Sequence, residues 1–368
     1  MSIKFKATRF IEHEPVTFKY DGGADVNAVS VFGRYFPADV KDGTLTAILS
    51  LPAGEYELDP IKAELPELAL VPSGDEKDGK LDVMIDGKLF TSYVYTDKLF
   101  KPYLGPVMTS FGESYTRLDF ETKEHPHHRS VFFGVGDVSL DGRDDIGNVD
   151  FWNEPANCGI QTHVGIEDVT VGSASASFTA KTLWSSHDGE PMADAACEYK
   201  FYAQPEGCRY VDVAMTFTAS YGELHFGATK EAGPLGVRMA DPLRVENGGD
   251  MRNSYGASGE RECWGKAANW CVYGGELSGR KVGIAVFDNE GNERYPTTWH
   301  IRNYGLFAAN NLYFRGGLTI PKGESLTYRY RIVFFEGVCE LPRIADPKKL
   351  PRDLKFVNIR DKFIEYCK

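Results

Sequence analysis

The sequence has no long run of apolar residues. Lys4, Lys6 and Arg9 interrupt the N-terminal stretch with charge, so it contains no apolar core of a secretory signal. No later stretch approaches the roughly 18 uninterrupted apolar residues that a transmembrane helix needs. These absences predict a cytoplasmic protein without a membrane partner.

Cysteines are few and follow no ligand pattern. The chain has seven, and no two are spaced as a CxxC pair. An odd number without a secretion signal is typical of reduced thiols in the cytoplasm. The spacing also gives no support to a zinc–cysteine site.

Motifs of several common enzyme classes are missing. The sequence contains no GxGxxG, no Walker loop, no GxSxG and no HExxH. Dinucleotide binding, phosphoryl transfer and serine hydrolysis therefore have no signature here. Basic residues are outnumbered as well, with 41 Lys and Arg against 53 Asp and Glu and a net charge of −12. An acidic surface repels phosphate backbones, so we expect no nucleic-acid partner.

Strand and turn residues are abundant. The chain has 38 Gly, 23 Phe and 19 Tyr, a composition that favours strands joined by tight turns. Asp86-Gly87 between apolar runs predicts a hairpin. The segment 326–335 alternates apolar and polar residues, as a strand with one buried face does. A helical pattern is found only between Asp353 and Lys368.

The order of these signals predicts an all-β fold. We expect a small N-terminal β-sandwich-like domain over residues 1–75 and a large antiparallel β-sandwich over 76–340. Residues 341–368 are expected to form a tail with a short helix. Prolines, Gly74 and a charged cluster within 65–80 suggest a linker there.

The densest chemical signal is the segment Glu124–Arg129, where three of the eight histidines fall within four positions. Pro126 disfavours the helical region for the residue before it. In an extended segment, His125, His127 and Arg129 share one face and His128 points to the other. Such a face suits a metal, a proton transfer or an anionic substrate. The alternative is a solvated loop.

Two further segments carry possible ligand-binding residues. Trp152 lies between Asp150 and Glu154, and an aromatic face flanked by carboxylates is typical of sugar sites. A core tryptophan is the alternative. Leu224–Gly233, taken as a strand, places His225, Thr229 and Glu231 on one face and Lys230 on the other. A surface Lys–Glu pair is the alternative there.

Two later segments are also predicted to be strands. Cys263–Trp270 would place Lys266 between two tryptophans on one face. Pro296–Gly305 would direct Trp299 and Ile301 into the core. The opposite face would then carry His300, Arg302 and Tyr304, which favours the lining of a pocket over an ordinary solvent-facing strand.

Together these segments resemble a bacterial family of unknown function that is labelled PmoA-like, after a methane oxygenase. The motifs occur in family order: Lys101-Pro102-Tyr103-Leu104-Gly105-Pro106-Val107, His125-Pro126-His127-His128-Arg129-Ser130, Gly136-Asp137-Val138, Asp150-Phe151-Trp152, Thr229-Lys230-Glu231, Gly236-Val237-Arg238, Asn253-Ser254, Gly259-Glu260, Trp264-Gly265-Lys266-Ala267 and Thr298-Trp299-His300-Ile301-Arg302. The resemblance covers roughly residues 80–337. We set methane oxidation aside because those oxygenase subunits are membrane proteins and this sequence has no membrane segment.

The resemblance implies a fold and a substrate class. Members of the family accompany sugar oxidoreductases, and their expected architecture is similar to the β-supersandwich of galactose mutarotase, which uses histidines and carboxylates as acid and base on a sugar. This chain departs from the family pattern at Glu124, where an aspartate is usual, and in a longer insert over Leu140–Val149. Residues 1–75 lie outside the resemblance.

The resulting hypothesis is an enzyme that acts on a sugar or on a glycoside, for example an oxidised one, by general acid–base chemistry, like an epimerase, a mutarotase or a lyase. No cofactor is required. Two alternatives stay open: a metal-dependent sugar enzyme and a non-catalytic carbohydrate-binding protein. A homo-oligomer or a subunit of an enzyme complex is also compatible with the sequence.

The expected catalytic residues, which are also the ligands if a metal is bound, are His125, His127, Glu231 and His300. The expected substrate-binding residues are Arg129, Asp150, Trp152, Lys230, Arg238, Glu260, Lys266, Arg302 and Tyr304.

Overall fold

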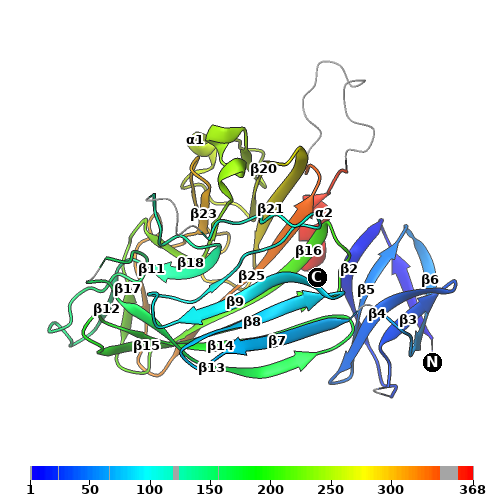
Figure 1. The fold of residues 1–368 in the computed structure, drawn as a ribbon, viewed down its shortest axis with the longest axis horizontal. Coiled ribbons are helices and arrows are strands. Elements are labelled where there is room, and N and C mark those ends of the chain that lie inside the picture. Colours follow the sequence, from blue (N-terminus) through cyan, green and yellow to red (C-terminus); the bar gives the residue numbers. More distant parts are fainter. Residues whose placement is uncertain are drawn as a thin grey trace.

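Antiparallel sheets make up most of the molecule (Figure 1). The computed structural model describes residues 2–23, 25–65, 67–118, 124–155, 157–339 and 355–367. Within them the strands form one six-stranded, one three-stranded and two eight-stranded sheets. The predicted all-β, sandwich-like class is confirmed. No helix in these ranges is long and apolar enough to cross a membrane.

Strands between Ile3 and Ile61 form the six-stranded sheet, which lies at the right of Figure 1. Its core is its own, with Leu45, Leu49 and Leu58 fully buried between strands whose apolar residues alternate with polar ones. In the order β1-β6-β3-β4-β5-β2, the strands are β1 (Ile3–Ala7), β6 (Gly54–Ile61), β3 (Ala28–Val31), β4 (Arg34–Lys41), β5 (Thr44–Leu51) and β2 (Ile11–Lys19).

The first eight-stranded sheet carries the candidate site. The predicted Asp86-Gly87 hairpin joins two of its strands, and both turn residues have positive φ, as a primed turn requires. The predicted linker is wrong over residues 68–74, which form an edge strand. In the order β22-β23-β18-β11-β10-β9-β8-β7, the strands are β22 (Trp299–Ile301), β23 (Leu306–Ala309), β18 (Ala232–Arg238), β11 (Val131–Val135), β10 (Tyr103–Leu104), β9 (Lys88–Thr96), β8 (Asp78–Ile85) and β7 (Leu68–Gly74).

The second eight-stranded sheet packs against the first. Phe90 of β9 contacts Phe201 and Phe334 of this sheet at ring distances of 6.5 and 5.9 Å. The predicted alternation in 326–335 is confirmed, because Tyr328, Ile332 and their alternate neighbours enter this core. In the order β13-β14-β15-β16-β25-β21-β20-β19, the strands are β13 (Ile160–Val171), β14 (Ser175–Ser185), β15 (Pro191–Tyr202), β16 (Cys208–Thr218), β25 (Ser325–Glu336), β21 (Arg280–Asp288), β20 (Trp270–Leu277) and β19 (Asp250–Asn253).

The remaining elements are short, and two of them correct predicted strands. Residues 224–233 are not one strand, because β17 ends at Phe226 and a loop precedes β18. Residues 263–270 are a helix end and a loop rather than a strand. The short elements are β12 (Val138–Leu140), β17 (Leu224–Phe226), β24 (Leu318–Ile320), η1 (Asp241–Leu243), η2 (Val245–Asn247), α1 (Glu260–Cys263) and α2 (Ile359–Tyr366).

The predicted C-terminal helix is α2, which joins the six-stranded sheet to the second eight-stranded sheet (Figure 1). Asn358 caps its first turn by accepting a hydrogen bond from the Asp361 amide. Phe363 packs on Phe287 of β21, while Lys362 reaches Glu12 of β2. The domain boundaries at residues 75 and 340 stay a prediction. Strand β7, which precedes residue 75, is hydrogen-bonded to β8 and so belongs to the first eight-stranded sheet.

Candidate functional site

The site lies on the outer face of the first eight-stranded sheet, the face turned away from the core between the sheets. Strand alternation selects the residues that reach it. In β22, Trp299 and Ile301 are buried in the main core, so His300 between them faces outward. The same rule directs Phe132 of β11 and Arg238 of β18 to this face.

The segment Glu124–Arg129 forms a turn over this face and is not extended as predicted. The His128 amide donates a hydrogen bond to the His125 carbonyl at 3.0 Å, and His125 has a φ of 49°. The turn brings the rings together: His125 stacks on His128 at 5.1 Å, and His127 meets His128 edge-on at 4.2 Å. The prediction that His128 points away from the other two is therefore wrong.

Two aromatic residues connect this turn to the end of β22. Tyr304 stacks on His125 with ring centres 4.6 Å apart. The Trp152 ring lies 5.2 Å from that of His128 and 6.3 Å from that of His300. His125, His127, His128 and His300, which we call the histidine cluster, thus come from segments more than 170 residues apart in sequence.

Trp152 and Asp150 support the cluster and are not open to a ligand. The Trp152 side chain is only 2 % exposed and packs on Phe132, so it offers no free face to a sugar ring as expected from the sequence. The Asp150 carboxylate accepts hydrogen bonds from the amides of Trp152 and Asn153 and from the Asn153 side chain. Its oxygens hold the loop, which corrects their expected role in binding sugar hydroxyls.

A buried charged group lies beside the cluster. Lys101 donates to the Trp152 carbonyl at 2.7 Å and pairs with Glu154 at 3.0 Å. Arg129 donates to the same Glu154 oxygen at 2.6 Å. Burial raises the pKa of Glu154, but Lys101 and Arg129 outweigh that effect and hold the pKa below its usual value. One carboxylate is therefore shared by two cations.

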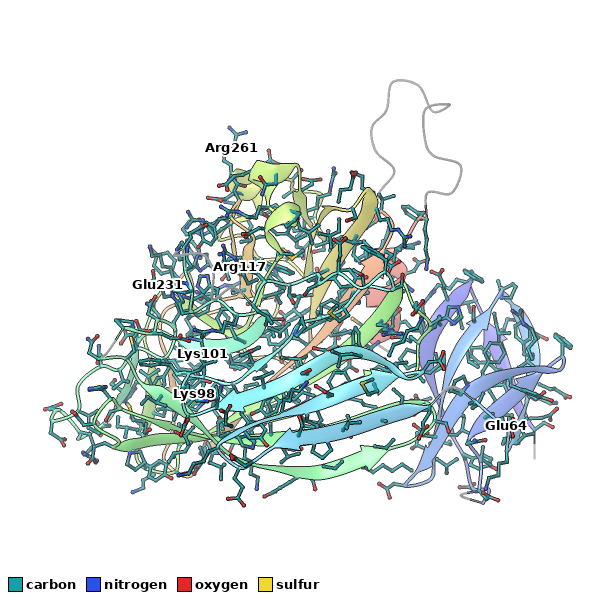
Figure 2. All side chains as sticks on the ribbon, viewed as in Figure 1. Glu64, Lys98, Lys101, Arg117, Glu231 and Arg261 are labelled. Atoms are coloured by element: carbon teal, nitrogen blue, oxygen red, sulfur yellow. The ribbon has the colours of Figure 1, made fainter. Side chains whose placement is uncertain are left out.

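Arg238 is a second buried cation, with no exposed surface. Its nearest described carboxylate is Glu124 at 3.8 Å, and its guanidinium lies over the Tyr304 ring. Glu124 itself binds Arg244 at 2.9 Å. Burial and the neighbouring Arg117 lower the pKa of Arg238 to about 10. Figure 2 shows Arg117 and Lys101 near this face of the sheet.

All four cluster histidines favour the neutral form. Burial, followed by the charge of Lys101, lowers the pKa of His127 to about 3. Burial also lowers the pKa of His300 to about 4, although a backbone contact with Lys230 opposes the shift. The pKa of His128 lies well below its usual value because of burial and of His127. Burial and Arg238 lower the pKa of His125.

Several cluster nitrogens have no partner among the described residues. Both ring nitrogens of His300, Nε2 of His127 and Nε2 of His128 are buried without a hydrogen bond of good geometry. The Nε and Nη2 atoms of Arg238 are likewise buried without a hydrogen bond of good geometry. A buried polar group without a partner is costly, so such a concentration is a feature that packing alone does not explain.

The other predicted site residues lie at the rim or farther away. Lys230 pairs with Glu231 at 3.5 Å, and no contact joins Glu231 to a cluster histidine within the described ranges. Arg302 pairs with Glu260 at 3.1 Å. The Lys266 side chain is exposed, and Trp264 and Trp270 do not flank it as expected, because the strand begins only at Trp270.

The predicted metal ligands do not form a metal centre in the part of the chain that the structure describes. No three His, Cys, Asp or Glu side chains in these ranges are arranged to hold a metal ion. His125 is held between the rings of Tyr304 and His128, and the carboxylates beside the cluster, Glu124 and Glu154, are bound by arginine and lysine side chains. This set of donors fits an electron-rich ligand better than a cation.

Three residues of the site were missed as site residues in the sequence: Lys101, Arg117 and Glu154. Lys101 opens the Lys-Pro-Tyr motif, and Glu154 follows Trp152, so both lay within segments already singled out. Arg117 has no such signal. It donates to the carbonyls of Glu124 and His125 and thereby fixes the histidine turn.

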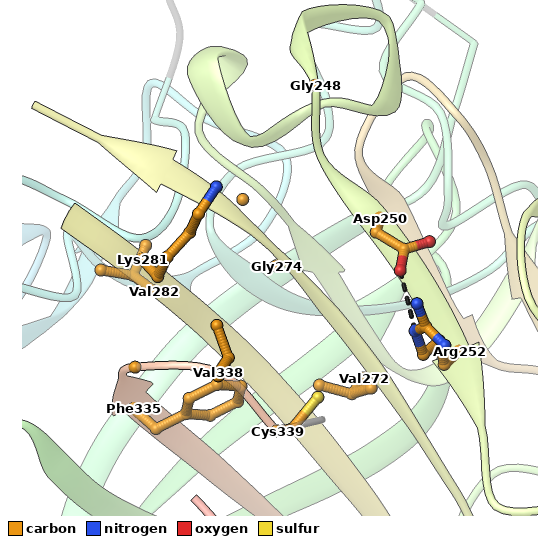
Figure 3. Close-up of a pocket in the computed structure, with 12 residues that line it drawn as sticks. Gly248, Asp250, Arg252, Val272, Gly274, Lys281, Val282, Phe335, Val338 and Cys339 are labelled. Atoms are coloured by element: carbon orange, nitrogen blue, oxygen red, sulfur yellow. Dashed lines mark hydrogen bonds and ion pairs between the residues drawn. The ribbon is translucent and has the colours of Figure 1, made fainter. Parts of the chain in front are cut away.

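One cavity of the described structure lies close to the cluster. A depression of about 450 Å³ is lined by Glu260, Arg261, Trp264 and Asn303 and adjoins Tyr304 through Asn303. Trp264 is partly exposed there. Figure 3 shows another cavity, of about 210 Å³, between glycines and apolar residues of β20 and β21 and the Asp250–Arg252 ion pair. No residue of the histidine cluster lines it.

Residues 80–346 match the model of a family described as a family of unknown function, DUF6807. No curated protein matches the chain. Heparan sulfate lyase HepC from Pedobacter heparinus is similar at 10 % identity and a TM-score of 0.28, over 85 % of this chain and 36 % of that one. A TPR-domain containing protein from Parabacteroides distasonis is similar at 11 % identity and a TM-score of 0.25, over 95 % of this chain and 59 % of the other.

The chain thus spans less than two thirds of either solved relative. TM-scores this low support no conclusion about fold or activity. The resemblance to PmoA-like proteins and to galactose mutarotase stays a prediction. The family match agrees with the sequence analysis in one respect, that the function of the family is unknown.

Proposed function

The chain belongs to the DUF6807 family, and we propose that this member is an enzyme acting on a sugar or an oxidised glycoside by general acid–base chemistry. The proposal rests on one observation. Four histidines from two distant segments gather on one sheet face, and several of their buried nitrogens, including Nε2 of His127 and Nε2 of His128, make no hydrogen bond of good geometry with a described residue. Packing alone does not require such an arrangement, because apolar side chains would fill the same space at lower cost.

The neutral histidines are suited to accept a proton. With pKa values of about 3 and 4, His127 and His300 are uncharged at neutral pH and offer a free lone pair. A proton removed from a carbon next to a carbonyl, or from a ring hydroxyl, leaves negative charge on the substrate. That charge raises the pKa of a neighbouring histidine, so the base becomes stronger in the complex than in the free protein.

The buried cations are placed to stabilise that negative charge. Arg238 contacts the Tyr304 ring and lies 3.5 Å from His128, with two of its nitrogens unbonded. Lys101 and Arg129 both bind the Glu154 carboxylate. Fixed donors in a dry site stabilise a developing oxyanion without reorganising at the moment of reaction. We assign this electrostatic role to Arg238 first.

The rim provides room for the substrate. The side chains of His125, Lys230 and Arg302 are between 32 and 50 % exposed. The depression beside Tyr304 includes Trp264, whose partly exposed ring can take the stacking role that the buried Trp152 cannot. A ring bound there would reach the histidines across Tyr304.

The test measures proton abstraction directly. The purified protein is incubated in D2O with a panel of aldoses and of glycosides that carry a ring ketone, and carbon-bound deuterium and anomer ratios are followed by NMR. We expect the wild type to accelerate exchange or anomer interconversion for at least one substrate. His127→Gln and His300→Gln each should lower that rate by about 10²–10⁴-fold.

A matched control is His225→Gln. His225 lies in the three-stranded sheet, where it contacts Thr319 at 2.9 Å, and it should keep wild-type activity. Wild-type rates in both cluster variants would contradict the proposal. Binding of a sugar without any exchange, cleavage or epimerisation would instead identify a non-catalytic carbohydrate-binding protein.

A further inference from the structure

A second, larger cleft lies between the six-stranded sheet and the turns at the end of the sandwich. Its volume is about 610 Å³, within the range of small-molecule sites. One wall comes from β2, β4 and β5, and the other from the β8–β9 and β15–β16 turns. The lining includes His13, Arg34, Tyr35, Phe36, Lys88 and Arg209. None of these residues belongs to the histidine cluster.

Arg209 is a buried cation that forms no ion pair with a carboxylate of the described residues, although the charges of Glu206, Glu336 and Asp86 act on it. It follows the first residue of β16 and is 8 % exposed, with its guanidinium 5.1 Å from the Phe90 ring centre. Its Nε makes no hydrogen bond. Two of these carboxylates have other partners, since Glu206 binds Lys88 at 2.6 Å and Glu336 accepts hydrogen bonds from Ser110.

The mouth of the cleft adds positive charge and an aromatic surface. Arg34 is exposed at the start of β4 and makes no ion pair with a described residue. Tyr35 beside it is 56 % exposed, although large aromatic side chains usually bury more of their surface. Of the charged groups lining the cleft, Asp86 is the one acid that is not paired with Lys88.

The two walls are fixed to each other. The Gln204 side chain donates to the His13 carbonyl at 2.8 Å, at a bulge of β2 where His13 has a φ of 52°. On the same side of the sheet, the Asp39 carboxylate accepts hydrogen bonds from the amides of residues 173–175. The cleft is therefore already formed without a ligand, which lowers the entropic cost of binding.

We propose that this cleft binds a small molecule that carries a carboxylate or phosphate group, with the anion on Arg209 and the rest of the molecule against Tyr35 and Phe36. The planar guanidinium matches both oxyanions, and a bound anion supplies the hydrogen bonds and the ion pair that Arg209 lacks. A buried arginine without an ion pair is costly to stability, and a buried charged group that lines a cleft is a candidate for ligand binding. This inference does not depend on the activity proposed for the histidine cluster.

The test is calorimetric titration of the full chain, at constant ionic strength, with inorganic phosphate, with glucuronate and with neutral glucose. We expect at least one anionic probe to bind and glucose to leave no signal in this cleft. Stronger binding of phosphate indicates a phosphate-bearing ligand, and stronger binding of glucuronate a carboxylate. Arg209→Met keeps the apolar contact with Phe90 and should weaken the anionic probe about 10- to 100-fold.

Two more variants make the result decisive. Arg34→Gln changes an exposed residue, so the protein stays folded, and it should weaken the same probe by about threefold. His300→Gln alters the other site and should bind the probe like the wild type. Equal affinity of the wild type and Arg209→Met would overturn the proposal, as would failure of both anions to bind, or loss of binding in His300→Gln alone.

Discussion

Individual histidines of the cluster are expected to make the fold sensitive to acid. His300 is 6 % exposed, and its pKa is about 4 in the folded protein against about 6.5 in an unfolded chain. Between these values the unfolded state binds the extra proton. The contribution of neutral His300 to the free energy of unfolding is therefore present above pH 6.5 and is lost as the pH falls toward 4.

This prediction is checked by denaturant unfolding at pH 7 and pH 5.5. Over that interval the titration of His300 alone should lower the unfolding free energy of the wild type by about 1 kcal/mol. His300→Gln should remove about that much of the pH dependence, because glutamine does not titrate. The exposed His187→Gln is the matched control and should keep the wild-type slope. An unchanged slope in His300→Gln would show that the imidazole is not held neutral.

For single residues, the sequence predicted which side chains belong to the site more accurately than it predicted the direction in which they point. The density of histidines marked His125, His127 and Arg129, and all three lie in or beside the cluster. The side toward which His128 points was mispredicted, because one backbone hydrogen bond turns an extended segment into a tight turn. The partnership of Lys101 with Glu154 spans 53 positions, and no local pattern encodes such a contact.

Among the secondary-structure elements, β11 carries a glycine that makes room for the site. An added Cβ at Gly134 would lie 2.8 Å from the Phe151 carbonyl oxygen and 3.2 Å from the Trp152 Cα. The loop that holds Trp152 therefore crosses the strand at backbone contact. Gly134→Val should destabilise the protein by about 1–3 kcal/mol through overpacking. It should also shift tryptophan fluorescence and reduce any activity of the histidine cluster.

The control for this substitution is Gly165→Val in β13, where an added Cβ meets nothing within 4 Å. That variant should unfold at a denaturant concentration close to the wild type. If both valine variants behave alike, the contact between β11 and the Trp152 loop is not what requires a glycine.

Strands with a regular alternation were predictable, and interrupted segments were not. The alternating residues of β25 all enter the core as expected. The segment after Glu260 fails as a strand because Gly259 and Gly265 have φ values of 74° and 69°, which turn the chain at both ends of α1. Conversely, Pro72 suggested a linker, but β7 is the edge strand of its sheet, where a missing amide donor is tolerated.

In the whole molecule, α2 holds the six-stranded sheet against the sandwich through buried charge. Lys362 is 2 % exposed and donates to the Glu12 carbonyl at 3.2 Å, with Glu14 at 3.8 Å. Arg9 pairs with Glu14 and with Glu365 of the helix. Lys362→Met should lower the unfolding free energy by about 1–3 kcal/mol and loosen α2 before the sandwich unfolds.

Hydrogen exchange followed by mass spectrometry measures this loosening as faster exchange of the amides in residues 359–366. Arg360→Met, which changes an exposed residue of the same helix, should leave those amides protected. Equal exchange in the two variants would mean that the apolar contacts of Phe363 and Tyr366 hold the helix without help from the charges.

The contact between Arg9 and α2 also sets an order of events during synthesis. These partners are 352 to 356 positions apart, so the first cannot meet the second until nearly the whole described chain has left the ribosome. At a translation rate of about 5–20 residues per second, the gap is roughly 20–70 s. During that time the six-stranded sheet has its own core but lacks its contacts with α2. Glu14, which is buried in the folded protein, has not yet met Lys362. A nascent-chain chaperone that recognises this uncovered face would act only within that interval.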